Sequence, residues 1–206
     1  MNPVLTGEHR KVAAKRLLDV SLAVPALLLL TPILALIAIA VKLESPGNPI
    51  YMGRRVGRFG KPFNLVKFRT MVLGADRIGP LVTASGDPRI TRLGRFLRRT
   101  KLDELPSLWN VISGDMSLVG PRPENEQAAA LYTGEQREVL SLLPGITSLA
   151  TLKYHHEEAL LAAGADLEST YFQLMQDKLN LELQYVHTRN LALDLRILFR
   201  TVLALF

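Results

Sequence analysis

An uncharged, apolar run decides the fold of this chain: it reads VSLAVPALLLLTPILALIAIAV and extends from Val20 to Val41. At 1.5 Å per residue, a helix of this length reaches about 33 Å, enough to match the hydrocarbon thickness of a bilayer. Pro25 and Pro32 lie within the run. Each lacks an N–H group and leaves a carbonyl one turn earlier without its helical donor, so the two prolines favour a bend. The sequence therefore predicts a membrane-embedded helix that bends near Thr31-Pro32.

The charges that flank this run bear on how it sits in the membrane. Basic residues crowd both ends, namely Arg10, Lys11, Lys15 and Arg16 before it and Lys42, Arg54, Arg55, Arg58 and Lys61 after it. Because positive flanks stay on the cytoplasmic side, we expect both ends on one face of the membrane, as in a re-entrant helix. The Thr31 hydroxyl is expected to bond a carbonyl freed by the break. A straight span and a cleavable signal peptide ending near 38–40 remain the alternatives.

The overall composition limits the class of protein. A chain of 206 residues with no internal repeat suits a single domain, 1–206. Its 48% of hydrophobic residues excludes a disordered chain. The absence of cysteine excludes a disulfide scaffold, a thiolate metal site and a cysteine nucleophile.

The basic residues are concentrated in the middle of the chain. The formal net charge is +6, and the segment Arg54–Lys101 carries most of the basic excess, whereas acidic residues predominate after it. Such a segment favours an anionic partner: nucleic acid, lipid headgroups or a diphosphate substrate. We expect no nucleic acid, because aromatic residues make up only 6% of the chain and no helix-turn-helix, zinc or RNP pattern accompanies the basic segment.

Two local elements are predicted within this basic segment. The runs Ile50–Met52 and Phe63–Phe68 resemble short strands around a turn at 57–60, which predicts a hairpin. Further on, arginines recur every third residue with apolar residues between them, a pattern that predicts an amphipathic helix with a guanidinium-rich face. That face suits solvent or lipid headgroups, or a substrate phosphate. The arginines are Arg89, Arg92, Arg95 and Arg98.

Paired carboxylates follow the basic helix at Asp103 and Glu104. Proline is tolerated in the first turn of a helix, so Pro106 predicts a helix that begins within a residue or two of the pair. Beside a cluster of arginines, one carboxylate can attack phosphorus while the other holds Mg²⁺. Simple helix capping is the alternative role for the pair.

A stiff loop comes next, at 114–124, where Arg122 lies between Pro121 and Pro123. The two prolines restrict the backbone and can present the guanidinium in a fixed direction. A rigid basic loop beside paired carboxylates indicates phosphate handling, although an ordinary tight turn also explains the prolines.

The C-terminal third is predicted to be helical, with helices over 164–180 and 181–206. An apolar stripe on the last helix suits a core, an interface or the bilayer surface; it comprises Leu191, Leu195, Leu198, Val202 and Leu205. A metal site at 155–158 (His-His-Glu-Glu) is disfavoured, because adjacent helical residues point about 100° apart.

Taken together, the motifs resemble those of the bacterial sugar transferases, the monotopic phosphoglycosyl transferases. The resemblance covers nearly everything from Lys15 to Thr201. The motifs that carry it are Lys15-Arg16-Leu17-Leu18-Asp19, Thr31-Pro32, Ser45-Pro46-Gly47, Arg55-Val56-Gly57, Lys67-Phe68-Arg69-Thr70-Met71, Asp87-Pro88-Arg89-Ile90-Thr91, Leu102-Asp103-Glu104-Leu105-Pro106, Gly114-Asp115-Met116-Ser117, Gly120-Pro121-Arg122-Pro123-Glu124 and Pro144-Gly145-Ile146-Thr147.

The resemblance implies an enzyme that transfers a sugar-1-phosphate from a UDP-sugar to undecaprenyl phosphate and releases UMP. This is the first membrane step of glycan assembly, such as that of O-antigen, capsule, exopolysaccharide or glycoprotein. It places the enzyme at the cytoplasmic face of the inner membrane, as a monotopic protein. The resemblance also implies a ping-pong mechanism through a covalent phosphosugar intermediate.

Individual roles carry over onto the matching positions. The resemblance assigns the covalent intermediate to Asp103 and the Mg²⁺ site to Glu104, and the helix break to Thr31-Pro32. Lys67, Arg98 and Arg122 match basic positions expected around the diphosphate. Two departures stand out: the segment 148–150 (Ser-Leu-Ala) replaces the more usual Gly-Leu-Trp, and Pro25 is an additional proline.

We therefore expect an α+β fold: a mostly helical small domain with a short β-hairpin, anchored by an N-terminal re-entrant helix and by amphipathic interfacial helices. Residues 10–44 form the membrane-embedded part and 45–206 the cytosolic catalytic part. The expected partners are a UDP-sugar, undecaprenyl phosphate and membrane lipids, and the sequence leaves open whether a homo-oligomer forms. The alternative is a non-catalytic membrane scaffold that binds anionic lipid or a polyprenyl diphosphosugar.

Overall fold

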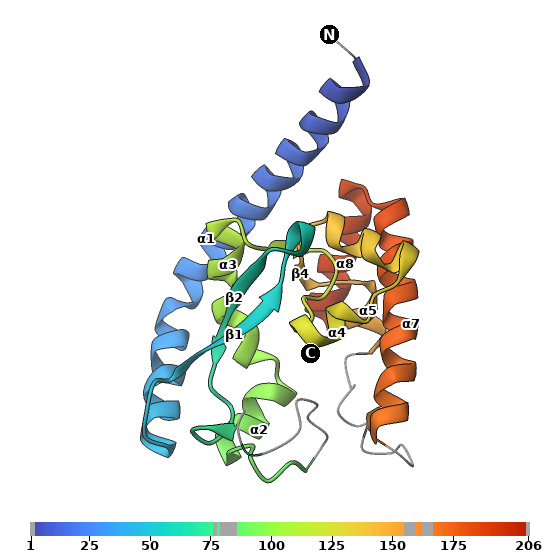
Figure 1. Cartoon of the computed structure of the whole chain (residues 1–206). Helices are drawn as coiled ribbons and strands as arrows, with labels where there is room; N and C mark the ends of the chain where they lie inside the picture. Colours follow the sequence, from blue (N-terminus) through green and yellow to red (C-terminus); the bar gives the residue numbers. More distant parts are fainter. Residues whose placement is uncertain (1–2, 76–77, 79–85, 155–159, 162–166, 205–206) are drawn as a thin grey trace.

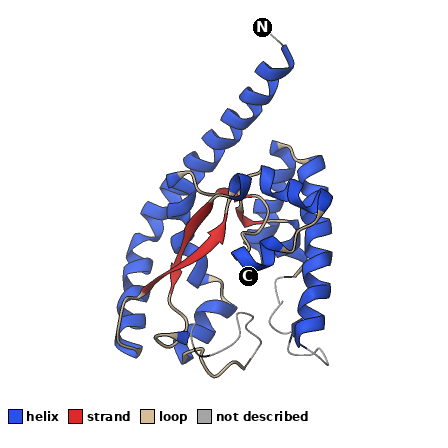
Figure 2. Ribbon diagram, in the orientation of Figure 1, coloured by secondary structure: helices blue, strands red, loops and turns tan. Residues whose placement is uncertain are grey.

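The computed structural model describes residues 3–75, 78, 86–154, 160–161 and 167–204 of the chain. Helices predominate in it, and the strands form two small two-stranded sheets (Figure 2). The predicted α+β class, mostly helical with a short hairpin, is confirmed. The candidate metal residues at 155–158 lie outside the described part.

Helix α1 (Pro3–Glu44) is one uninterrupted helix that includes both Pro25 and Pro32. Its ribbon changes direction partway along (Figure 1). Among the described residues it is the one helix long and apolar enough to cross a membrane, by length and composition. The Thr31 hydroxyl donates to the carbonyl of Leu27 at 2.8 Å. The predicted hydroxyl bond therefore exists, but its acceptor is not the carbonyl that Pro32 frees, because a threonine hydroxyl readily reaches the carbonyl four residues earlier.

One face of α1 packs against the rest of the molecule. The residues on it recur every three or four positions, which places them on a single face of a helix. They are the buried Asp19, Ala23 and Val41 and the partly buried Ala26, Leu27, Leu30, Leu34, Ile37 and Ala38. The rest of the helix surface exposes large apolar side chains, namely Leu22, Leu28, Leu29, Ile33, Leu36, Ile39 and Leu43. One face is thus bound to the domain, and the other is available to lipid.

The predicted hairpin is confirmed. Strands β1 (Ile50–Val56) and β2 (Pro62–Phe68) pair in antiparallel register, with Ile50 opposite Phe68. A short 3-10 helix, η1 (Arg58–Gly60), makes the turn between them. Gly60 has a φ of 76°, in the left-handed region that glycine adopts without strain.

A second, parallel sheet joins β3 (Ser117–Val119) to β4 (Gly145–Thr147). The backbones cross closely at its end: a Cβ atom added to Gly145 would lie 2.1 Å from the amide nitrogen of Gly120. Only glycine fits there. Gly145 also donates its N–H to the carbonyl of Pro121 at 2.8 Å, which holds the beginning of the loop that carries Arg122.

Short helices connect these strands, and two longer helices end the chain. The short ones are α2 (Arg92–Arg99), η3 (Leu102–Ser107), α3 (Leu108–Ser113), α4 (Glu126–Ala130), η4 (Gly134–Ser141) and α5 (Leu149–Lys153). The long ones are α7 (Leu167–Thr188) and α8 (Leu191–Ala204). Figure 1 shows α1 and α7 on opposite sides of the hairpin.

The predicted boundary between the last two helices was wrong. The break lies at Arg189-Asn190 and not at 180–181. Asn190 sets it, because its side-chain oxygen accepts the N–H of Leu193 at 2.9 Å and so caps the first turn of α8. The stripe predicted on this helix is largely exposed: Leu195 and Val202 are 50% and 53% exposed. Leu205 lies outside the described residues.

Arg89 also departs from its predicted place on the amphipathic helix. Helix α2 begins later, where the Thr91 hydroxyl accepts the N–H of Gly94 and caps the helix. Arg89 precedes it and is buried, with its guanidinium 2.6 Å from the carboxylate of Asp87. Its second contact is the carbonyl of Ala75, at 3.0 Å. Arg89 therefore closes a loop and does not belong to the basic face of α2.

Three apolar clusters hold the elements together. The largest joins α1, α3, β3, α7 and α8 around Ala23, Val111, Val119, Tyr185 and Ile197. A second joins α1 to β2 and α2 through Val41, Phe68 and Leu97. The third fixes α7 against α4 and η4. Because α1 takes part in two of them, the membrane-type helix is an integral part of this core.

Candidate active site

The carboxylate pair lies in the first turn of η3, a helix that begins directly after Lys101. Lys101 has a φ of 57°, a left-handed conformation that turns the chain sharply out of α2. The predicted helix start beside Asp103 and Glu104 is confirmed, although the helix is of the 3-10 type before it continues as α3. Asp103 is buried at 5% exposure, and Glu104 is half-buried.

The Arg122 guanidinium reaches this pair from the loop that follows β3. Its Nη2 donates to Glu104 Oε1 at 2.8 Å, and its Nη1 donates to Glu104 Oε2 at 3.4 Å. Such a two-point contact fixes the relative direction of a guanidinium and a carboxylate. The two residues are 18 positions apart in the sequence, and the structure brings them into direct contact.

Lys67 approaches the pair from strand β2. Burial lowers the pKa of its ammonium group, and the charges of Asp103 and Glu104 oppose that effect. The strand is held in place by Asn110 of α3, whose side chain accepts the N–H of Val66 and donates to the carbonyl of Asn64, each at 2.9 Å. A single buried amide thus fixes the part of β2 that precedes Lys67.

Arg98 completes the group from α2. Its Nε donates to the hydroxyl of Thr70 at 2.9 Å, and its charge partly offsets the rise in the pKa of the Asp103 carboxyl. All five residues that the sequence singled out for chemistry therefore lie around one centre, supplied by β2, α2, η3 and the loop after β3. They are Lys67, Arg98, Asp103, Glu104 and Arg122.

The two carboxylates differ sharply in their acidity. Burial, and then the charge of Glu104, raise the pKa of Asp103 to about 6. For Glu104, burial acts in the same upward direction, but the Arg122 guanidinium outweighs it and holds the pKa at about 2. Asp103 Oδ1 is buried and has no hydrogen-bond partner among the described residues. Glu104 is thus a carboxylate bound to a cation, whereas Asp103 has one oxygen with no hydrogen-bond partner among the described residues.

The donor set suits a divalent cation only in part. Mg²⁺ prefers oxygen ligands and is commonly bound by one or two carboxylates together with substrate phosphates and water. Asp103 and Glu104 supply two adjacent carboxylates, one with the unpartnered Oδ1. The part of the chain that the structure describes contains no group of three or more His, Asp or Glu side chains that could together hold a metal ion. The pair would need further oxygen ligands, such as phosphate oxygens and water, to hold Mg²⁺.

The sequence reasoning missed several groups that act on this centre. The charge of Lys101 favours the ionised form of both carboxyls, and the charge of Arg55 adds to the effect of burial on Lys67. Lys101 was detectable as a basic residue two positions before Asp103, but its left-handed backbone was not. Asn110 and the buried Glu182 of α7 were missed because their contacts join residues 44 to 60 positions apart.

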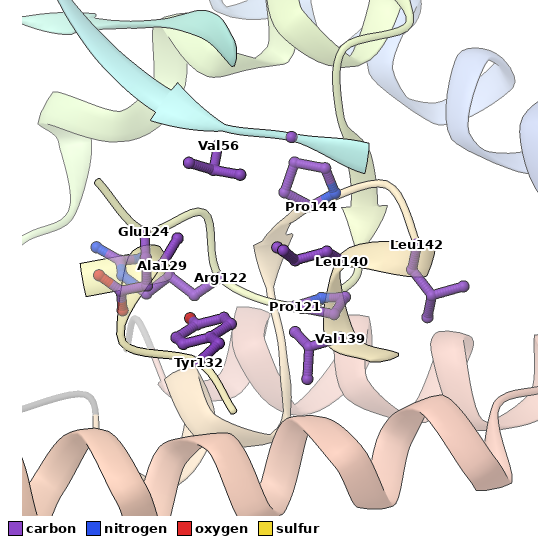
Figure 3. A pocket seen from close by; sticks show the side chains of 11 residues that line it. Val56, Pro121, Arg122, Glu124, Ala129, Tyr132, Val139, Leu140, Leu142 and Pro144 are labelled. Atoms are coloured by element: carbon purple, nitrogen blue, oxygen red, sulfur yellow. The ribbon is translucent and has the colours of Figure 1, made fainter. Parts of the chain in front are cut away.

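The Arg122 loop also borders a small hollow with a cavity volume of about 10 Å³ (Figure 3). Its lining is mainly apolar and comes from the end of β1, the loop itself and η4. The lining residues include Val56, Pro121, Tyr132, Leu140 and Pro144 beside Arg122.

Thr31 and Pro32 take no part in the centre around Asp103 and Glu104, because they lie within α1.

Comparisons with known proteins show which family the chain resembles. The chain matches a model of the bacterial sugar transferase family over residues 10–206. It is 39% identical over 203 residues to the UDP-glucose:undecaprenyl-phosphate glucose-1-phosphate transferase of Escherichia coli (strain K12), covering 96% of this chain and 41% of that protein. A protein of the same name from Caulobacter vibrioides is 40% identical over 193 residues, which cover 91% of this chain and 68% of the relative.

A third relative carries the name of a different sugar. The UDP-N-acetylgalactosamine-undecaprenyl-phosphate N-acetylgalactosaminephosphotransferase of Aeromonas hydrophila is 33% identical over 193 residues, 91% of this chain and 42% of the relative. The chain thus spans about two fifths of the length of two of these relatives and about two thirds of the third.

Proposed function

The chain belongs to the bacterial sugar transferase family, a family of phosphoglycosyl transferases, and from this premise we propose that it transfers a sugar-1-phosphate from a UDP-sugar to undecaprenyl phosphate and releases UMP. The predicted family is thereby confirmed. The three relatives share undecaprenyl phosphate in their names, but two of them name glucose and the third names N-acetylgalactosamine. The sugar that this chain transfers is left to experiment.

One observation of the site carries the proposal: a buried carboxylate with a free oxygen, Asp103 Oδ1, lies among cations. A diphosphate needs positive charge to enter such a centre, and Lys67, Arg98 and Arg122 supply it. Burial disfavours the charged form of the carboxyl and removes the water that would otherwise solvate it. These features suit attack on a phosphorus atom.

In the proposed reaction, Asp103 Oδ1 forms a bond to the phosphorus nearest the sugar, and the bond from that phosphorus to the bridging oxygen breaks. UMP leaves with the bridging oxygen and its electron pair. An oxygen of undecaprenyl phosphate then bonds to the same phosphorus, and the Asp103 carboxylate is released. The two half-reactions use one site in turn, which gives ping-pong kinetics.

The basic residues hold and neutralise the substrates during both halves. The two-point contact with Arg122 fixes the orientation of the Glu104 carboxylate. The Thr70 hydroxyl accepts a hydrogen bond from Arg98 and holds its guanidinium in place. We assign the Mg²⁺ ligand role to Glu104, with Asp103 adjacent; when bound, the cation screens the repulsion between the diphosphate and the carboxylates.

The packing of α1 supports a monotopic arrangement at the cytoplasmic face of the inner membrane. Just before the apolar run, Arg16 donates to the carbonyls of Val111 and Ile112 in α3. At its other end, the Glu44 carboxylate accepts the N–H of Leu93 in α2 at 2.8 Å. These points are about 42 Å apart along a helix. A straight span would place two parts of one folded domain on opposite sides of the bilayer, whereas a helix that enters and returns keeps them together.

The test is a product assay with the purified full chain in nanodiscs. The protein is incubated with Mg²⁺, undecaprenyl phosphate and a panel of UDP-sugars, and UMP release is measured. We expect UMP with at least one sugar and only when undecaprenyl phosphate is present for repeated turnover. Absence of UMP with every sugar would contradict the proposal and favour the non-catalytic scaffold, which no contact in the site specifically supports.

A further inference from the structure

One face of α7 follows the backbone that carries Arg122. The face consists of residues spaced by four and by three, so that they lie on one side of the helix. They contact the end of β3 and the loop after it at three points. The order of these contacts along α7 is the reverse of their order along β3 and the loop. The contacts are Lys178 Nζ to Glu124 Oε1 at 3.6 Å, the backbone N–H of Arg122 to Glu182 Oε1 at 3.3 Å, and the Tyr185 hydroxyl to the carbonyl of Val119 at 3.3 Å.

Glu182 is the central and most unusual of these contacts. It is 4% exposed. Its Oε1 accepts from the Ser148 hydroxyl at 2.7 Å as well as from Arg122, and its Oε2 is buried with no hydrogen-bond partner among the described residues. A buried carboxyl that leaves an oxygen unbonded is unfavourable for folding. Burial accordingly raises the pKa of this group to about 7.

The position of Glu182 connects it to the reacting centre through a single residue. Its bond holds the main chain of Arg122, and Pro121 and Pro123 restrict the backbone on either side. The Arg122 side chain then binds Glu104 at two points. The order of contacts is therefore Ser148 to Glu182, Glu182 to the Arg122 backbone, and the Arg122 guanidinium to Glu104.

Building on the proposed function, we infer that Glu182 is a positioning residue, which holds the Arg122 backbone so that the guanidinium stays on Glu104. Ser148 holds Glu182 in turn, and this gives a role to the first residue of the unusual segment at 148–150. Glu182 acts through Arg122 and touches no substrate.

A double-mutant cycle tests whether Glu182 acts through Arg122. We expect Glu182→Ala to lower the rate of UMP release about tenfold in the wild-type background and less than about twofold in an Arg122→Ala background, because the group that it positions is then absent. Glu182→Gln keeps an oxygen for the Ser148 and Arg122 donors and should restore most of the rate. Equal losses from Glu182→Ala in both backgrounds would overturn the inference.

Leu179→Ala is the matched control. Leu179 lies one turn away on α7 and is equally buried, but packs in the cluster of α4 and η4. It should lower thermal stability without coupling to Arg122. If Leu179→Ala reproduces the kinetic pattern of Glu182→Ala, general destabilisation explains the effect and the inference is wrong.

A second measurement does not depend on turnover. The ¹⁵N signals of the Arg122 guanidinium, identified by their loss in Arg122→Lys, report how firmly that group is held. We expect them to broaden or shift in Glu182→Ala and to stay unchanged in Leu179→Ala and Glu182→Gln. Unchanged signals in Glu182→Ala would overturn the inference even if UMP is released. If the wild type releases no UMP but the signals respond as expected, the proposed function fails and the positioning role stands.

Discussion

Asp103 and Glu104 are neighbours in the chain, yet their surroundings give them opposite properties. Glu104 is bound to a guanidinium and stays ionised, whereas Asp103 is buried with a free oxygen and a raised pKa. When the environments of two carboxyls push their pKa values apart, the two can take different roles in one reaction. A nucleophile and an electrostatic partner are the roles that suit this pair.

The first prediction concerns the nucleophile. Asp103→Asn keeps the size of the side chain but removes the nucleophilic carboxylate, so we expect UMP release to fall by at least about a thousandfold. Wild-type protein mixed with UDP-sugar alone should gain the mass of one sugar phosphate, and the variant should not. Glu138→Gln, at an exposed acidic residue of η4 outside the site, is the control and should behave as wild type. Near-normal turnover by Asp103→Asn would contradict the assignment.

The second prediction concerns pH and Glu182. Because the folded state raises the pKa of this acid from 4.5 to about 7, the native protein binds a proton that the unfolded chain has already lost. Stability should therefore fall as pH rises from about 5 to about 8, by about 3 kcal/mol from this group. Nearby Lys178 and Arg122 favour the charged form and limit the shift.

Glu182→Gln removes that titration. The variant should gain melting temperature relative to wild type as pH increases from about 5 to about 8, as measured by thermal unfolding in the same detergent at both ends of the range. A constant difference between the two proteins across this range would show that Glu182 does not titrate there.

At the scale of elements, strand β2 depends on one side chain of α3. Asn110 is 2% exposed and bonds to the backbone on both sides of Leu65. Its removal takes this partner from the N–H of Val66 and the carbonyl of Asn64, both in partly buried contacts, and an unsatisfied group that is buried costs about 1–3 kcal/mol. The strand that it holds also carries Lys67, so the structural and functional effects are linked.

We therefore expect Asn110→Ala to lower the free energy of unfolding by about 2–4 kcal/mol and to weaken UDP-sugar binding. Equilibrium unfolding and titration calorimetry measure the two effects. Asn64→Ala is the matched control: only the Asn64 carbonyl takes part in the contact, and the side chain is exposed. Similar losses in both variants would show that the Asn110 amide is not what holds the strand.

Helix α8 presents a different kind of surface. Asp194 and Ile197 face the core, and Asp194 is bound by Lys15 of α1 at 2.7 Å. The other side exposes Leu195, Phe199, Val202 and Leu203 near Arg196 and Arg200. An apolar face flanked by arginines is typical of a helix at the bilayer surface.

A fluorescence experiment tests this membrane contact. In a Trp109→Phe background, which removes the single tryptophan, Phe199→Trp should be quenched by brominated lipids because the residue enters the bilayer. Gln173→Trp, at an exposed polar position of α7, should be quenched far less. Equal quenching at the two positions would exclude a specific contact of α8 with the bilayer.

At the scale of the whole molecule, the question is on which side of the membrane each end of α1 lies. Both flanks of the apolar run of α1, at Arg16 and at Glu44, are bonded to one folded domain, so we expect both flanks on the cytoplasmic side. The chain has no cysteine, which makes single-cysteine labelling unambiguous. Lys11→Cys and Lys42→Cys should both resist a membrane-impermeant maleimide in intact cells and react after the cells are opened.

His187→Cys in α7 is the reference for the domain and should behave in the same way. A straight span predicts a different result, in which one of the two α1 positions reacts in intact cells. That outcome would exclude the re-entrant arrangement and leave the catalytic proposal to stand on the product assay.

Much of this molecule could be predicted from the sequence because its signals are local. The apolar run, the hairpin around 57–60 and the helix start beside Asp103 each depend on residues close together in the chain. Boundaries were less accurate: Asn190 ends one helix and begins the next through a single capping bond, a weak signal beside a long apolar pattern.

By itself, the sequence determined the main element types, which follow from short-range periodicity and proline, and its ordered motifs carried the resemblance that named the family and singled out the five residues of the candidate centre. Only the tertiary structure decided which carboxylate is bound by Arg122, that Arg89 is buried away from the basic face, and that α7 holds the Arg122 loop. These contacts join residues distant in sequence or depend on burial, and the free energy of a buried charge is set by everything packed around it.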